Sequence, residues 1–241
     1  MKQIKGGTVA LANSTWATLS PQSGGDFSPF RENRAGLNES IKEYLQSIHY
    51  PRYQHLPPLV FMPAHQHTDT IHVAGKSPAP KFFDGVITAG PSVIVSLLAD
   101  CLGLAFRDEK ENVTGLLHIS RITIGKGIIE SFAKAWPGNA KTTRVAILPG
   151  ICKRCLSFPV DEFHGKIMPH MPKLTMYFST VRKNQVYVDL KKLTLHLLWQ
   201  NGFNQLHTTV SKDCTVCDPN DYYWSHRRHG NPRGAVIIIN E

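Results

Sequence analysis

Apolar and polar positions alternate with a helical period in three stretches of the chain. In residues 31–49 apolar side chains recur every three or four positions and the opposite face is polar, which predicts an amphipathic helix that Pro51 ends. The apolar positions are Leu37, Ile41, Tyr44, Leu45 and Ile48. The same reasoning predicts helices at 128–136 and at about 189–201, the latter stopped by Gly202.

Shorter apolar runs rich in β-branched residues predict buried strands. The clearest are residues 93–98 and 112–119, and the polar segment 108–112 between them predicts a hairpin. Further strands are expected at 60–62, 71–73, 144–149 and 235–239. Strands and helices alternate without a regular βαβ period, so we expect an α+β fold in which mixed β-sheets pack as a sandwich with flanking helices.

Composition narrows the class of protein. The chain has 241 residues, 41% hydrophobic and 19% charged, and contains neither a repeat nor a long linker, so a single domain over residues 1–241 is expected. The first residues lack the apolar region of a signal peptide, and no run reaches the ~18 apolar residues of a transmembrane helix. We therefore expect a cytoplasmic protein that does not associate with a membrane. The pattern leaves the oligomeric state open.

Positive charge points to anionic partners. The formal net charge is +9, and the densest basic cluster combines residues 226–229 with Arg233. Such an excess favours phosphate-bearing small molecules or nucleic acid.

A histidine and cysteine set forms a candidate metal site. Cys101 and His118 each follow an apolar run, and His67 lies upstream with His65 beside it. Two imidazoles and a thiolate suit Zn²⁺, and three protein ligands leave a fourth position for water or substrate, as in catalytic sites. From spacing alone, a buried cysteine and satisfied core histidines are the favoured interpretation over a metal site.

Two C-x₂-C pairs form a rival metal motif. Cys152 and Cys155 are followed by Cys214 and Cys217, which could together hold a structural zinc ion, as in zinc-ribbon proteins that bind nucleic acid. The separation of the pairs, residues 156–213, is far longer than the usual ~15–20 residues of a ribbon. Five cysteines, an odd number, in such close pairs argue against a disulfide framework.

Several other enzyme classes lack their motifs in this sequence. There is no G-x-S-x-G elbow, Walker loop or H-E-x-x-H helix, and no H-x-E tripeptide of the nucleobase deaminases.

An ordered series of short blocks resembles the YfiH-type laccase-domain family, a group of zinc-containing purine nucleoside phosphorylases once described as multicopper polyphenol oxidases. The blocks are DGVIT at 84–88, LADCL at 98–102, HISR at 118–121, LPGIC at 148–152, VDL at 188–190, CT at 214–215 and YWSHRR at 223–228. They resemble the family's ADALVT, TADCLP, HAGWRG, GPAIG, LDL and CTY…FFSYRR blocks. Their order agrees over roughly residues 6–240.

The resemblance implies a fold of two sheets between helical layers and a catalytic zinc ion. It implies zinc ligands at His67, Cys101 and His118, with His67 preferred over His65 because Ile71 then falls on an apolar family position. Cys101 and His118 would act in catalysis together with Asp100, while Arg121, Arg227 and Arg228 would bind substrate. Asp100 would either orient a ligand or cap the end of the buried strand before it. The implied substrates are phosphate and a purine nucleoside (adenosine, inosine, guanosine or methylthioadenosine), with adenosine deaminase as a side activity. Nucleic acid is not an implied partner.

Two family arginines are unmatched. Ile122 stands at the arginine position of the histidine block, and Ile4-Lys5 precede the glycine pair near the N-terminus. If residues 118–123 continued a strand, Arg121 would face away from the position of Ile122 and could not substitute for the missing arginine. The family also admits a peptidoglycan-precursor editing hydrolase or a non-catalytic paralogue. Blue-copper chemistry is disfavoured, because the histidines do not form paired copper motifs.

Overall fold

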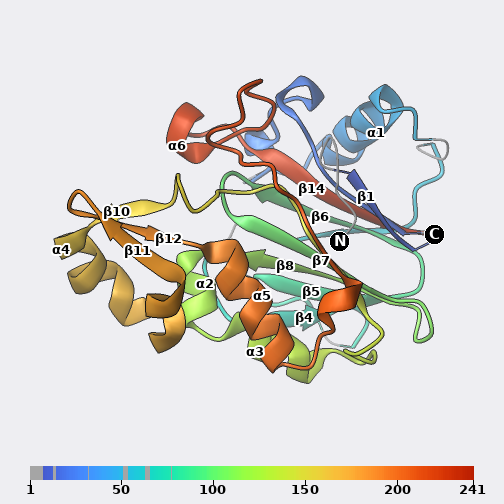
Figure 1. The fold of residues 1–241 in the computed structure, drawn as a ribbon. Coiled ribbons are helices and arrows are strands. Elements are labelled where there is room, and N and C mark those ends of the chain that lie inside the picture. The colour runs from blue at the N-terminus through green and yellow to red at the C-terminus, as the bar shows by residue number, and fades with distance from the viewer. Residues whose placement is uncertain (1–7, 13–14, 32, 51–53, 63–65, 77) are drawn as a thin grey trace.

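Two mixed β-sheets stack face to face in the computed structural model (Figure 1). The structure describes residues 8–12, 15–31, 33–50, 54–62, 66–76 and 78–241. Pro51, the alternative ligand His65 and the segment containing Ile4 and Lys5 lie outside the described residues.

The first sheet has five strands and the second has six. In spatial order the first contains β1 (Thr8–Ala12), β2 (Thr15–Leu19), β14 (Gly234–Asn240), β6 (Ser92–Leu98) and β3 (Leu59–Phe61). The second contains β13 (Thr208–Val210), β9 (Arg144–Ile147), β7 (Leu102–Asp108), β8 (Val113–Ile119), β5 (Gly85–Ala89) and β4 (Ile71–Val73). Only β3–β6, β13–β9 and β4–β5 pair in parallel among the pairs described within these two sheets.

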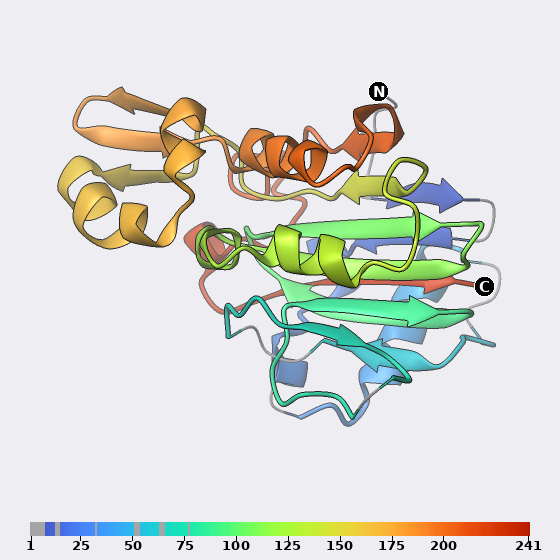
Figure 2. The ribbon, with the colours of Figure 1, turned by 90° about the horizontal axis from the view of Figure 1, so that it is seen from below.

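Helices cover both outer faces. Helix α1 (Leu37–Ser47) packs on the five-stranded sheet. On the six-stranded sheet lie α2 (Arg121–Gly125), α3 (Ile128–Ala135) and α5 (Leu190–Gln200). A small antiparallel sheet with adjoining short helices projects beside one end of the six-stranded sheet, as Figure 2 shows most clearly. This part contains β10 (Ser157–Pro159), α4 (Val160–Glu162), β11 (Ser179–Arg182) and β12 (Gln185–Val188). The layered arrangement confirms the expected α+β sandwich.

Strand alternation decides which side chains enter the space between the sheets. On β8, Leu116 packs in the core between the sheets, while Leu117 and Ile119 pack against the outer helical layer. Because side chains two apart on a strand share a face, His118 is directed inward with Leu116. In the described part of the chain, no helix is long and apolar enough to cross a membrane.

Several predicted elements are confirmed with small shifts. The helices predicted at 128–136 and 189–201 are α3 and α5, and Asp189 caps α5 by accepting the backbone N–H of Lys192 at 3.1 Å. The strands predicted at 60–62, 71–73, 93–98, 112–119 and 235–239 correspond to β3, β4, β6, β8 and β14. The strand predicted at 144–149 ends at Ile147.

The first predicted helix is shorter than expected. It begins at Leu37 rather than at residue 31, because Gly36 adopts a left-handed conformation with φ of 79° that breaks any helix before it. It ends at Ser47. Four of the five predicted apolar positions are buried, and Ile48, beyond the helix, is exposed.

The predicted hairpin has a different first strand. Strand β8 pairs with β7, whereas β6 lies in the other sheet and pairs with β14 and β3. The apolar run 93–106 is two strands, and the chain passes from one sheet to the other at residues 99–101. Asp100 makes that crossing with a φ of 75°.

Strand β8 ends at Ile119, as predicted, and the residues after Ser120 form helix α2. Ser120 caps α2, accepting the backbone N–H groups of Ile122 and Thr123, while the Thr123 side chain accepts the Ser120 N–H in return. On a helix the strand argument against Arg121 does not apply.

Candidate active site

Strand ends converge around a cavity of about 320 Å³ at one end of the sandwich. The strands β3, β6 and β8 end there, and β7 and β14 begin there, because antiparallel neighbours place opposite termini at the same edge. The apolar lining consists of Phe61, Met62, Leu97, Leu98, Ile151, Leu156 and Leu190. The polar lining includes His67, Asp100, Cys101, His118 and several basic side chains.

His67, Cys101 and His118 meet in this cavity. The imidazole centroids of His67 and His118 lie 5.5 Å apart, and both rings hydrogen-bond the thiol of Cys101. They come from three separate segments: the loop before β4, the start of β7 and the end of β8. The structure therefore brings together the three residues that the resemblance implied as zinc ligands.

Charge is shared between the cysteine and its histidine neighbours. Burial opposes ionisation of Cys101, but the charge and hydrogen bond of His118, with those of His67, lower the pKa of the thiol to about 6. Burial likewise opposes a charged imidazole at His118, yet the Cys101 thiolate and Asp84 raise its pKa to about 9. The site favours a thiolate, which is the form that binds a metal.

Asp84 orients His118 from behind. Its Oδ1 lies 2.7 Å from Nδ1 of His118, and its Oδ2 accepts the backbone N–H of Thr68 at 2.7 Å and the Thr68 hydroxyl at 3.0 Å. Burial alone would raise the pKa of Asp84, but these hydrogen bonds hold the pKa below its ordinary value. A carboxylate can only accept, so Nδ1 donates and Nε2 of His118 is the nitrogen left for a ligand.

These contacts fit a zinc ion. The donors are two imidazole nitrogens and one thiolate, and a buried carboxylate holds one imidazole in the tautomer that a metal ligand needs. His67 and Asp100 adopt positive φ values of 54° and 75°, a conformation that residues other than glycine rarely adopt and that is frequent at functional sites.

Asp100 holds the loop beside Cys101 instead of facing a ligand with a free carboxylate. Its Oδ1 accepts the hydroxyl of Thr215 at 2.7 Å, and its Oδ2 accepts the backbone N–H of Arg227 at 2.9 Å. The backbone N–H of Ile151 donates to its carbonyl oxygen at 2.8 Å. Three segments are thereby fixed to the residue that precedes Cys101.

Arg121 and Arg227 both line the cavity and both approach the same aromatic ring of the small sheet. The guanidinium carbons of Arg121 and Arg227 lie 5.9 and 5.7 Å from the ring centroid of Phe158 on β10. Both arginines line the cavity, as does Ile122. The capping of α2 and the short helix α6 (His226–His229) position them.

Three basic cavity residues lay outside the predicted substrate-binding set: Arg31, His226 and Arg233. Arg233 donates through Nη1 to the carbonyl oxygens of Gly230, Asn231 and Pro232, at 2.7 to 2.9 Å. Burial, and then the positive charge of Arg31, lower the pKa of Arg233. Two guanidinium groups that repel each other favour an anion between them. The basic cluster that includes Arg233 was the available signal in the sequence, whereas Arg31 carried none.

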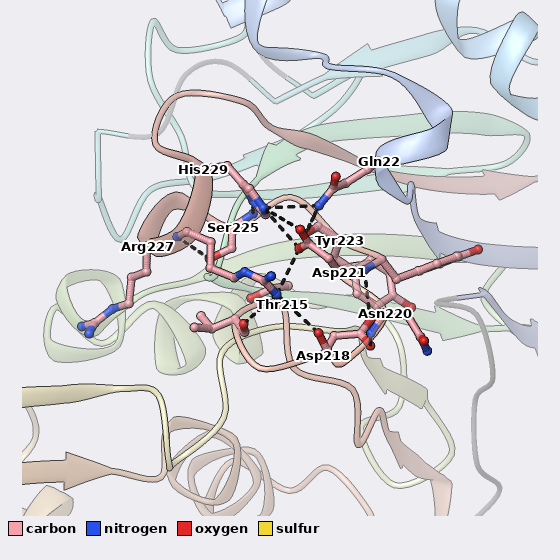
Figure 3. Close-up of polar contacts among 12 residues, drawn as sticks. Gln22, Thr215, Asp218, Asn220, Asp221, Tyr223, Ser225, Arg227 and His229 are labelled. Atoms are coloured by element: carbon pink, nitrogen blue, oxygen red, sulfur yellow. Dashed lines mark hydrogen bonds and ion pairs between the residues drawn. The ribbon is translucent and has the colours of Figure 1, made fainter.

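Arg228 is placed differently from its neighbour. Its Nη1 pairs with the Asp221 carboxylate at 3.0 Å and donates to the carbonyl oxygens of Val216 and Asp218 at 3.1 and 3.3 Å. Figure 3 shows the polar network around Asp221, with Gln22 and His229 directed toward it and the side chain of Arg227 extending away. Arg228 does not line the cavity, and its contacts fold the loop before α6.

Comparison with known proteins identifies the family of this chain. The family model for the multi-copper polyphenol oxidoreductase laccase domain matches residues 25–239. The chain belongs to this laccase-domain family. Related sequences include purine nucleoside phosphorylase YlmD of Bacillus subtilis, 28% identical over 165 residues, and mouse purine nucleoside phosphorylase LACC1, 24% identical over 180 residues. These alignments cover 66% and 71% of this chain but only 58% and 40% of the relatives.

Two solved structures share the fold over almost the whole chain. YfiH of Bacillus licheniformis superposes with a TM-score of 0.76 at 21% identity, covering 95% of this chain and 94% of the other. YlmD of Geobacillus stearothermophilus superposes with a TM-score of 0.77 at 20% identity, covering 97% and 94%. The expected YfiH-type architecture is confirmed.

Proposed function

We propose that this laccase-domain protein is a zinc-dependent purine nucleoside phosphorylase. One observation carries the proposal: a single cavity holds the His67, Cys101 and His118 set together with four arginines from separate segments. The arginines are Arg31, Arg121, Arg227 and Arg233. The names of the related YlmD and LACC1 proteins support the same activity.

The arginines supply the anion-binding function. Phosphorolysis needs inorganic phosphate held near the anomeric carbon of the ribose, and guanidinium groups bind phosphate through paired, charge-assisted hydrogen bonds. Ile122 stands where the family has an arginine. Arg121 supplies a guanidinium group in its place, because it lies on α2 and also lines the cavity. Arg31 and Arg233 form a second pair of cations there.

The apolar lining suits the purine. Phe61, Met62 and Leu98 come from the ends of β3 and β6. Ile151 and Leu156, which follow β9 in the sequence, also line the cavity. A cavity of this size lies at the lower end of the usual range for small-molecule sites. Burial of the base would exclude water from the anomeric carbon and favour phosphate as the nucleophile.

The reaction transfers the ribosyl group. A phosphate oxygen bonds to C1′ as the C1′–N9 bond breaks, and the purine leaves with the electron pair and takes up one proton, which gives a free base and ribose 1-phosphate. A zinc ion held by His67, Cys101 and His118 would supply Lewis acidity toward the leaving group. The arginines hold phosphate, Asp84 fixes the tautomer of His118, and Asp100 fixes the loops that carry Cys101 and Arg227.

A product assay tests the proposal. Purified, zinc-loaded protein is incubated with adenosine, with and without phosphate, and the products are separated by chromatography; inosine, guanosine and methylthioadenosine follow. We expect phosphate-dependent release of adenine, lost in His118→Ala and kept in Arg182→Ala, whose arginine is exposed on β11. No product from any nucleoside with zinc still bound would overturn the proposal. Inosine formed from adenosine without phosphate would add the deaminase activity.

A further inference from the structure

Two C-x₂-C turns face each other on the far side of the cavity loops. In one, the backbone N–H of Cys155 donates to the carbonyl oxygen of Cys152 at 3.0 Å; in the other, the N–H of Asp218 donates to the carbonyl oxygen of Cys214 at 3.2 Å. The four sulfur atoms of Cys152, Cys155, Cys214 and Cys217 all lie within 4.8 Å of one another. We call these four residues the cysteine cluster.

The sulfur spacing has the size of a metal site. The Sγ atoms of Cys152 and Cys217 are 3.7 Å apart. A tetrahedral zinc ion with Zn–S bonds of about 2.3 Å separates its sulfurs by about 3.8 Å, whereas a disulfide brings two sulfurs to about 2.05 Å. The separation therefore matches an edge of a ZnS₄ tetrahedron and not a disulfide.

Hydrogen-bond donors approach two of the sulfur atoms. The backbone N–H groups of Cys152 and Val216 donate to Sγ of Cys214 at 3.3 and 3.4 Å, and the Arg154 guanidinium donates to Sγ of Cys217 at 3.8 Å. The adjoining surface hollow is lined by five cations, Lys153, Arg154, Lys191, Lys192 and Lys212, against three carboxylates, Asp189, Asp213 and Asp218. Four thiolates around one Zn²⁺ carry a net charge of −2, which these donors and cations offset.

We propose that the cysteine cluster binds a structural zinc ion, separate from the cavity. The long gap between its two pairs is the small sheet with its helices, followed by α5 and β13, so the fold closes a site that sequence spacing alone disfavours. Closed tetrathiolate coordination is typical of structural and not of catalytic zinc. Cys217 is exposed and Cys152 partly so, which leaves the ion a path from solvent.

The proposed ion would fasten two loops that both contact Asp100. The first loop reaches it through the backbone N–H of Ile151, next to Cys152, and the second through the hydroxyl of Thr215, next to Cys214. Gly150 allows the close approach, since a Cβ there would come within 3.2 Å of the carbonyl oxygens of both Asp100 and Cys101. The cysteine cluster would thus hold in place the backbone that carries Cys101.

Metal stoichiometry tests the proposal without an activity readout. Elemental analysis of protein purified under reducing conditions should give two zinc ions per chain, falling to one in His118→Ala and to one in the double variant Cys155→Ser/Cys217→Ser. Refolding the wild-type chain with Co²⁺ should give the intense visible bands of a tetrathiolate site, kept in His118→Ala and absent from the double variant. The wild-type cobalt spectrum remains decisive where the double variant does not fold.

Each alternative gives a distinct result. Thiol titration of protein purified without reductant, then denatured and freed of metal, should find five free thiols, and a mass lower by two hydrogens with fewer thiols would show a disulfide and overturn the proposal. Iron in the tetrathiolate site would overturn the identity of the ion. An unchanged zinc count in the double variant would overturn the site. Because His118→Ala removes only the cavity ion, failure of the proposed activity leaves this test intact.

Discussion

Oδ1 of Asp84 lies 2.7 Å from Nδ1 of His118, and neither side chain is exposed by more than 1%. This contact sets which imidazole nitrogen faces the cavity. Asp84→Asn keeps the shape of the side chain but can present an amide donor to Nδ1, which disfavours the required tautomer. Loss of such a partner typically weakens a metal site 10–100-fold.

We therefore expect Asp84→Asn to raise the zinc dissociation constant of the cavity site by about 10–100-fold, measured by competition with a chelator. Asp161→Asn, at an exposed position on α4, is the matched control and should leave affinity unchanged. Equal zinc affinity in the Asp84 variant and the control would contradict the orienting role.

Arg121 and Arg227 should act on phosphate binding. Removing a hydrogen bond to a charged group costs about 1.5–3 kcal/mol, so Arg121→Ala and Arg227→Ala should each raise KM for phosphate at least about tenfold. KM for the nucleoside should change much less. Arg182→Ala is the control, and steady-state kinetics with phosphate varied is the measurement. A rise in KM for the nucleoside alone would place these arginines on the sugar or base.

Arg228 should behave differently from its neighbour in sequence. Its ion pair with Asp221 and its two carbonyl contacts are within the loop, so Arg228→Ala should lower the urea midpoint of unfolding while KM for phosphate changes less than in Arg227→Ala. An exposed ion pair contributes only up to about 1 kcal/mol, so the shift should be small. A phosphate KM raised as much as in Arg227→Ala would show that Arg228 reaches the substrate.

The hydrogen bond from Thr215 to Asp100 should be worth more, because both residues are buried. Thr215→Val leaves Oδ1 of Asp100 without this donor, which costs about 1–3 kcal/mol of unfolding free energy. Urea unfolding measures the loss. Thr180→Val, at an exposed position of β11, should cost nothing measurable. Equal stability of the two variants would contradict a structural role for the contact.

Close packing between α2 and the segment 168–170 makes Gly125 irreplaceable. A Cβ at Gly125 would lie 1.4 Å from the carbonyl oxygen of His170, and backbone cannot yield as a flexible side chain does. We expect Gly125→Ala to destabilise the fold by about 3 kcal/mol or more, seen in thermal or urea unfolding. Gly165→Ala is the control, because no atom lies within 4 Å of its added Cβ. A Gly125→Ala protein as stable as that control would be inconsistent with this packing.

Sequence patterns predicted the long elements well, since α3, α5, β6 and β14 carry strong periodic or continuous apolar signals. They failed where short local geometry decides. A single left-handed Gly36 shortened the first helix, and the reciprocal Ser120–Thr123 cap began a five-residue helix that no sequence pattern predicted. No periodicity can be read from so few residues, so the orientation of Arg121 needed the structure.

Some residues of the candidate site could likewise be found from the sequence and others could not. The resemblance supplied His67, Cys101 and His118, and the structure brings them together. Asp84 begins the DGVIT block, but no role could be assigned to it from the sequence. Its hydrogen-bond partner, His118, is 34 residues away and meets it only through the β5–β8 pairing. Arg31 and Arg228 show the converse: nothing local in the sequence reveals that the first lines the cavity and the second does not.

Strand β14 occupies the middle of the five-stranded sheet, paired with β2 on one side and β6 on the other. Because β14 comes last in the sequence among the strands of this sheet, its residues 234–240 leave the ribosome after the others. The same strand joins the two halves of the sheet. A nascent chain must hold the β1–β2 hairpin and β6 apart, with open apolar edges, until translation of this strand is finished.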